Sequence, residues 1–157
     1  MQLKRILFPT DFSDFSKHAA SFAVSFACDY GAKLHVLHVA EILHSLPGGL
    51  VAGTPPLEDI CEKAEEAARL ELESAATPEM VEKLDFEFAC VKGKPFVEII
   101  SYSLQTKIDM IVMGTHGRSA VAAAMMGSTA EKVLRKAPCP VFTVRMPGHR
   151  FVMPTIG

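Results

Sequence analysis

The chain has 157 residues, a length that suits one domain with enough core to fold by itself. Hydrophobic residues make up 49% of it and charged residues 22%, an ordinary balance for a globular protein. The net charge of −2 argues against a general nucleic-acid-binding protein, which usually carries a basic face. No signal peptide and no apolar run of membrane-spanning length is visible, so the sequence predicts a cytoplasmic protein without a membrane span.

The four cysteines lie far apart in the sequence and form no Cys-x-x-Cys pair: Cys28, Cys61, Cys90 and Cys139. Such spacing supports neither a zinc knuckle nor a thioredoxin-type redox site. Four cysteines are enough to form two disulfides, but nothing in the sequence indicates secretion, so we expect buried free thiols.

The first predicted element is a buried strand over residues 4–8, closed by Pro9. A helix follows over residues 14–30, with Ser13 as its N-cap and Gly31 as its C-terminal glycine. Apolar residues that recur at helical spacing are expected to form its buried stripe: Phe15, Ala19, Phe22 and Phe26.

The middle of the chain continues the alternation of strand and helix. A strand is predicted over residues 34–39, followed by a long loop over 41–56 that is rich in proline and glycine. A charged helix over 57–76 comes next, with its glutamates on the solvent face. A helical turn over 78–83 and a third strand over 84–91 complete this part.

The last third begins with a helix that opens at Pro95. A fourth strand is predicted over residues 108–113, a last helix over 128–136 and a fifth strand over 141–144. We expect one domain over residues 1–146 and a loosely ordered tail over 147–157.

Strands that alternate with helices predict an α/β fold with an open parallel five-stranded sheet and helices on both faces. Ligands bind such sheets at the carboxyl ends of the strands, where the strand order reverses. With the order 3-2-1-4-5, the turn at Asp11 after the first strand and Gly114 after the fourth strand would border one crevice.

A glycine motif directly follows the fourth strand. Gly114 and Gly117 are followed by Gly127 and Ser128, where the last helix begins. Glycines let backbone N–H groups approach a ligand, and a helix N-terminus adds donors and a positive dipole end, so the motif predicts a phosphate cradle. The alternative is a plain turn, with Ser128 to Glu131 as a capping box.

Three stretches of the chain resemble the universal stress protein family: residues 6–13, residues 112–118 with 127–129, and residues 138–144. The resemblance covers about residues 3–145. Because the glycine motif is complete, the chain is similar to the branch of this family that binds ATP. The implied fold is Rossmann-like and similar to that of adenine nucleotide α-hydrolases.

The resemblance implies a role for each matching position. Four residues would contact the adenosine portion of the nucleotide: Pro9, Thr10, Asp11 and, through its backbone at adenine, Val39. Two would lie beside the ribose: Met113 and Gly114. The phosphates would be held by a third group: His116, Gly117, Gly127, Ser128 and Thr129.

Some of these residues have a simpler interpretation. Asp11 is also a typical turn residue at a helix start, and Arg118 is either a phosphate partner or a solvated loop residue. His116 could act as a general base, although its place in the motif favours a backbone role. His35 and His38 point to opposite faces of a strand and cannot hold one metal ion together.

The resemblance implies ATP or another adenine nucleotide as ligand, with Mg²⁺ or Mn²⁺ carried on its phosphates. It also implies a homodimer through the last strand, over residues 141–145, and an unknown regulatory protein partner. The predicted function is a nucleotide sensor with at most slow hydrolysis, since Gly127 is followed directly by Ser128 without a Walker-type lysine.

Two alternatives stay open from the sequence. An enzyme that acts on the α-phosphate of ATP would carry a Ser-Gly-Gly-x-Asp-Ser loop after the first strand, which residues 9–13 do not match. A nucleotide-independent dimeric interaction module would need no intact glycine motif.

Overall fold

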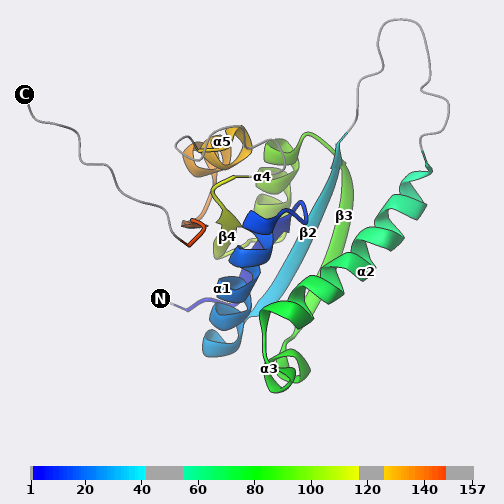
Figure 1. The fold of residues 1–157 in the computed structure, drawn as a ribbon. Coiled ribbons are helices and arrows are strands. Elements are labelled where there is room, and N and C mark those ends of the chain that lie inside the picture. The colour runs from blue at the N-terminus through cyan, green and yellow to red at the C-terminus, as the bar shows by residue number, and fades with distance from the viewer. Residues whose placement is uncertain (1, 42–54, 117–125, 148–157) are drawn as a thin grey trace, which may run out of the picture.

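The computed structural model describes residues 2–41, 55–116 and 126–147 (Figure 1). In this part of the chain, five parallel strands form one sheet in the order β3-β2-β1-β4-β5, which confirms the predicted order. The strands are β1 (Arg5–Thr10), β2 (Lys33–Glu41), β3 (Phe86–Gly93), β4 (Met110–Gly114) and β5 (Val141–Val144).

Helices cover both faces of the sheet. They are α1 (Asp14–Tyr30), α2 (Leu57–Ala75), α3 (Pro78–Lys83), α4 (Pro95–Gln105) and α5 (Ser128–Lys136). The helices α1 and α2 pack together on one face, and α4 and α5 pack together on the other (Figure 1). The sheet is therefore the middle layer of three, as the alternation of strands and helices predicted.

The strand β1 shows how the two halves of the core form. Ile6 and Phe8 point toward α1 and α2, whereas Leu7 between them points toward α4 and α5. All three side chains are fully buried, because successive residues of a central strand face opposite helical layers.

The helix α1 has the predicted ends but only part of the predicted buried stripe, since Ala19 is buried and Phe26 packs against the core. Ser13 Oγ accepts a hydrogen bond from Ser16 N at 3.4 Å, and Gly31 ends the helix with a φ of 59°. Small residues form most of its buried face: Ser16, Ala19, Ala20, Ala23, Val24 and Ala27. Phe22 was expected to be buried but is 37% exposed. The small side chains let α1 lie close to the sheet, so Phe22 is left beside Phe142 of β5.

The strand β1 runs through Pro9, which was expected to close it. Pro9 pairs with Leu37 and Thr10 with His38 of β2. On its other side, the pairing of β1 with β4 ends at Leu7, and Pro9 has no N–H group to extend such a ladder. The sheet therefore stops pairing between β1 and β4 where the strand order reverses.

The prediction of four free thiols was wrong for two cysteines. Cys61 of α2 and Cys90 of β3 form a disulfide with their Cα atoms 5.5 Å apart, while Cys28 and Cys139 are free. The two partners are 29 residues apart in sequence and meet only because α2 packs across β3.

Replacing Cys61 with serine is expected to lower the free energy of unfolding by about 3 kcal/mol, because the cross-link closes a long loop in the unfolded chain. Denaturation in urea under non-reducing conditions measures this loss. The matched variant Cys28→Ser, which removes a free thiol, is expected to keep the parent stability. Equal stability of the parent and Cys61→Ser without reductant would contradict the cross-link.

Candidate functional site

The two segments that the sequence predicts to border one crevice meet through the first turn of α1. A Cβ atom added to Gly114 would lie 2.9 Å from the backbone oxygen of Phe15, so only glycine fits at this end of β4. The ring of Phe15 also packs against that of His116, with centroids 4.9 Å apart. The turn after β1 and the segment after β4 therefore lie side by side.

The start of α5 is held next to the end of β4. The N–H group of Gly127 donates to the backbone oxygen of Thr115 at 2.8 Å, and Thr115 Oγ1 lies 2.9 Å from His116 Nδ1. His116 Nε2 is buried and has no hydrogen-bond partner in the described part of the chain. The hydrogen bond between Gly127 and Thr115 brings the first turn of α5 to the same edge of the sheet as Gly114.

The alternative interpretation of Ser128 as the start of a capping box was wrong. Gly127 is the N-cap of α5 and Ser128 is its first residue, and among the described residues no side chain caps this helix. The backbone N–H groups of the first turn have no partners within a helix, and they carry the positive end of its dipole. Ser128 and Thr129 are therefore placed to donate to an anion.

The remaining predicted residues lie as follows. Pro9, Thr10 and Met113 are buried at the ends of β1 and β4, while Val39 is half-buried in β2 opposite Val91. Gly117 and Arg118 lie outside the described residues, as does most of the predicted loop over 41–56.

Asp11 organises the turn between β1 and α1. Its Oδ1 accepts hydrogen bonds from Ser13 N at 3.0 Å and from Ser16 Oγ at 3.1 Å. This is the turn role that the residue type favours. The next residue, Phe12, has a φ of 62°, a left-handed conformation that is costly for a bulky side chain and is often found at functional sites.

His38 and Phe12 extend this turn toward β2. His38 Nδ1 lies 3.0 Å from the backbone oxygen of Thr10, and its ring stacks on Phe12 with centroids 4.9 Å apart. His35 and His38 face opposite sides of the sheet, as predicted: His35 contacts Tyr102 of α4, whereas His38 stacks on Phe12.

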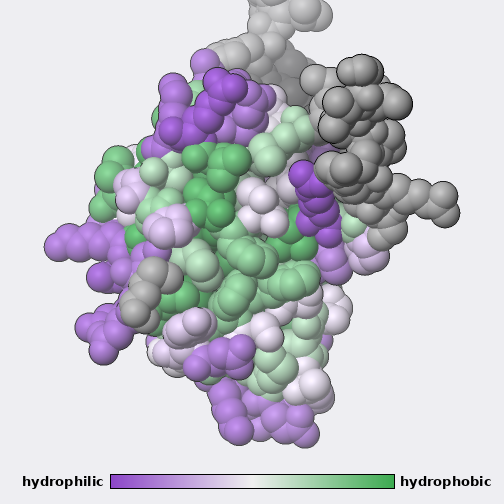
Figure 2. Space-filling view, turned by 90° about the vertical axis from the view of Figure 1, so that its left-hand side faces the viewer, coloured by the Kyte–Doolittle hydropathy of each residue, from purple (hydrophilic) through white to green (hydrophobic). Residues whose placement is uncertain are grey.

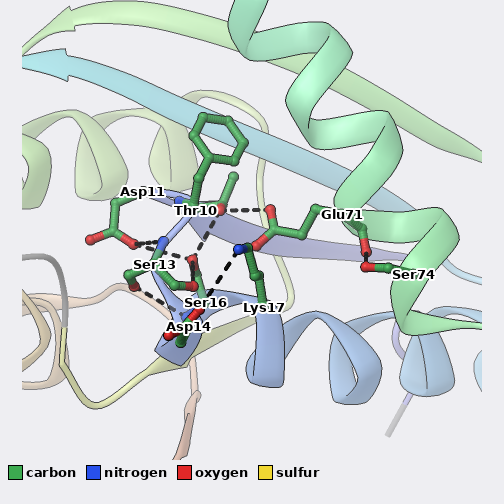
Figure 3. Close-up of polar contacts among 9 residues, drawn as sticks. Thr10, Asp11, Ser13, Asp14, Ser16, Lys17, Glu71 and Ser74 are labelled. Carbon is green, nitrogen blue, oxygen red and sulfur yellow. Dashed lines mark hydrogen bonds and ion pairs between the residues drawn. The ribbon is translucent and has the colours of Figure 1, made fainter.

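Glu71 of α2 is the residue that sequence reasoning missed. Glutamates of this helix were expected on its solvent face, but Glu71 is only 5% exposed and accepts a hydrogen bond on Oε2 from Thr10 Oγ1 at 2.7 Å (Figure 3). Its Oε1 has no hydrogen-bond partner among the described residues. A signal was present, because Ala64 and Ala68 begin a buried stripe that reaches position 71 at helical spacing.

Burial is the main reason that the pKa of Glu71 is raised to about 7, against the lowering effect of the Thr10 hydrogen bond and the nearby Ser16 hydroxyl. The negative charge of Asp11 raises the pKa further, whereas Lys17 lowers it. Lys17 is itself exposed and forms an ion pair with Asp14 at 3.7 Å (Figure 3). The carboxyl group of Glu71 therefore titrates near neutral pH.

Glu71 is expected to make the fold less stable as pH rises. Its pKa is 4.5 in the unfolded chain and about 7 in the folded one, so its full stability contribution is present below pH 4.5 and is lost as pH rises through about 7. Relative to Glu71→Gln, the parent should lose about 2–3 kcal/mol between about pH 5 and about pH 8, measured by urea denaturation. If the stabilities of the two proteins changed with pH in the same way, Glu71 would be ionised in the folded protein over this whole pH range, and its raised pKa would be contradicted.

The sequence model of the Universal stress protein family matches residues 2–145. The chain belongs to the universal stress protein family. It is 35% identical over 143 residues to a universal stress protein of Thermus aquaticus, covering 90% of this chain and 98% of that one. It is also 33% identical over 145 residues to one of Methanocaldococcus jannaschii, covering 92% and 83% of the two chains.

Solved structures share the fold. The universal stress protein UspA of Lactobacillus plantarum superimposes with a TM-score of 0.73 at 27% identity, covering 92% of this chain and 99% of its own. A universal stress protein in complex with cAMP has a TM-score of 0.67 at 21% identity, covering 92% and 98% of the two chains. One from Archaeoglobus fulgidus in complex with dAMP has a TM-score of 0.62 at 24% identity, covering 92% and 100%.

The described residues contain no helix that is long and apolar enough to cross a membrane.

Proposed function

We propose that this universal stress protein is a regulatory protein that binds ATP at the carboxyl ends of β1 and β4. The observation that carries the proposal is the junction of Thr115 and Gly127, which sets the uncapped start of α5 beside the end of β4. A helix start of this kind favours phosphate groups. Two proteins with this fold are in complex with adenine nucleotides, cAMP and dAMP.

In this proposal, the adenosine portion contacts Pro9, Thr10, Asp11 and Val39, and the ribose lies beside Met113 and Gly114. The amide of Gly127 is already used by Thr115, so Ser128 and Thr129 supply amides and hydroxyls to the phosphates. His116, Gly117 and Arg118 complete the phosphate side of the site.

A divalent cation, Mg²⁺ or Mn²⁺, enters with the phosphates in this proposal. Among the described residues, no group of three histidine, cysteine, aspartate or glutamate side chains is placed to hold a metal ion. Phosphate oxygens and water molecules would supply most of its ligands, as is common for Mg²⁺. The cation would neutralise phosphate charge, while the chain's own amides and hydroxyls orient the nucleotide.

We infer a sensor with slow hydrolysis at most, because Gly127 is followed by Ser128 without the lysine that cradles phosphates in fast nucleotide hydrolases. The nucleotide would alter a surface that a regulatory protein partner in the cytoplasm recognises.

Nucleotide-stripped protein is expected to bind Mg·ATP near one molecule per chain in calorimetric titration. Gly127→Val is expected to weaken binding at least tenfold, because a β-branched side chain would stand against the phosphates, and a tenfold change is about 1.4 kcal/mol. Mass spectrometry of the protein as purified would identify any resident nucleotide.

Thr77→Val is the matched control for this experiment. Thr77 is exposed and makes no side-chain capping bond at α3, which lies at the opposite end of the molecule from the site (Figure 1). It should bind Mg·ATP as the parent does. A folded parent protein that binds no adenine nucleotide would refute the proposal and favour an interaction module.

We also propose a homodimer through the edge strand β5, over residues 141–145. Phe142 of β5 is 38% exposed and Phe22 of α1 is 37% exposed, with ring centroids 5.9 Å apart. Phe26 packs edge-on against Phe142 at 5.1 Å. Figure 2 views the molecule from the left of Figure 1 and shows hydrophobic surface at the centre of this face, with polar residues around it. A second copy would cover both the open edge and the aromatics.

Phe142→Asp is expected to turn a dimer into a monomer in sedimentation equilibrium, because a carboxylate would be buried at the pairing edge. Leu104→Asp is the matched control, since Leu104 of α4 is 59% exposed and lies on the other helical layer. A parent protein that is monomeric at the same concentration would contradict the proposed dimer.

A further inference from the structure

Two hydroxyl groups connect the buried carboxyl group of Glu71 to the carboxylate of Asp11. Glu71 Oε2 lies 2.7 Å from Thr10 Oγ1. Thr10 Oγ1 lies 3.2 Å from Ser16 Oγ, which lies 3.1 Å from Asp11 Oδ1 (Figure 3). The chain of contacts therefore runs from the inner side of α2, through the end of β1, to the turn that begins α1.

The direction of these hydrogen bonds depends on the proton of Glu71, since each hydroxyl has one proton to donate. When Glu71 is neutral, its O–H group donates to Thr10, Thr10 donates to Ser16, and Ser16 donates to Asp11. Phe12 N also donates to Thr10 Oγ1 at 3.0 Å. Every donor in the chain is then used, and one negative charge stands at its end.

When Glu71 is ionised, it needs the proton of Thr10. Thr10 then has none to give to Ser16. The Ser16 hydroxyl is contested between Asp11, Thr10 and the backbone oxygen of Ser13, which lies 3.0 Å from Ser16 Oγ. A carboxylate now stands at each end of the chain, and Glu71 Oε1 is buried without a hydrogen-bond partner among the described residues. Burying a charge without full hydrogen bonding is costly, so the ionised arrangement is the poorer one.

We propose that Glu71 is a positioning residue that couples adenine-nucleotide binding to proton uptake, because its neutral form keeps the Ser16 hydroxyl donated to Asp11. The inference rests on the proposed nucleotide site, in which Asp11 contacts the adenosine portion. A second carboxylate near an anionic ligand is also unfavourable by Coulomb's law. Nucleotide affinity therefore falls as pH rises through neutrality.

The charged groups that act on Glu71 are Asp11 in the turn and Lys17 on α1. Beyond them, Asp14 forms an ion pair with Lys17, and His38 of β2 contacts the backbone oxygen of Thr10. From β3, Phe86 and Phe88 pack against the core under α2, and Cys90 is held in the disulfide, so these groups do not titrate. Burial raises the pKa of Glu71 to about 7, within the range that cells experience.

The test is calorimetric titration with Mg·ATP between about pH 6 and about pH 8, where coupling of typical size would lower the parent's affinity about fivefold to tenfold. Glu71→Gln should lose this component of the pH dependence. Glu73→Gln, an exposed glutamate on the same helix, should behave as the parent does. The terminal phosphate of ATP titrates near neutral pH, as do histidines, but both are common to all three proteins and cancel in the comparison.

Ser16→Ala provides a second variant, because it cuts the hydroxyl chain while leaving Glu71 in place. Titration in buffers of different ionisation enthalpy should show less proton uptake by Ser16→Ala than by the parent near neutral pH. Parallel affinity profiles for the parent and Glu71→Gln would overturn the inference and leave the nucleotide site intact, as would unchanged proton uptake in Ser16→Ala. Absence of binding by folded parent protein at every pH would overturn both the site and the inference.

Discussion

The loss of pairing between β1 and β4 beyond Leu7 is the constraint on which the site depends. Pro9 offers no N–H group to β4, yet β1 continues beside β2 as far as Thr10. The backbone after Thr10 can then turn across the end of β4, which places Phe15 against Gly114. A ladder that continued on both sides of β1 would leave no room for this turn.

The same turn combines a structural task with the proposed ligand contact. Asp11 stabilises the start of α1 through Ser13 and Ser16, so its carboxylate is oriented before any ligand arrives. Glu71 lies behind this turn and at near-neutral pH is a poorly solvated acid. A fold optimised for stability alone would place an apolar residue at position 71, because burying a carboxyl group costs free energy.

Much of the fold was predictable from the sequence, because local patterns determined it. The ends of α1, α3 and α5 follow from Ser13, Gly31, Pro78 and the apolar periodicity. The strand order follows from the usual arrangement of an open parallel sheet. Contacts between distant elements were not predictable. The disulfide of Cys61 and the burial of Glu71 both depend on where α2 lies across the sheet. The predicted burial of Phe22 in α1 was wrong, because the alanines of this helix form most of its buried face.

The close approach at Gly114 changes how the glycine motif should be read in other members of the family. A Cβ atom at this position would collide with the backbone of α1 whether or not a nucleotide is bound. A relative that had lost its ligand during evolution would therefore still be under selection to keep this glycine. Its presence reports on the packing of the first helix, so the proposed phosphate contacts are better judged from Gly127, Ser128 and Thr129 further along the motif.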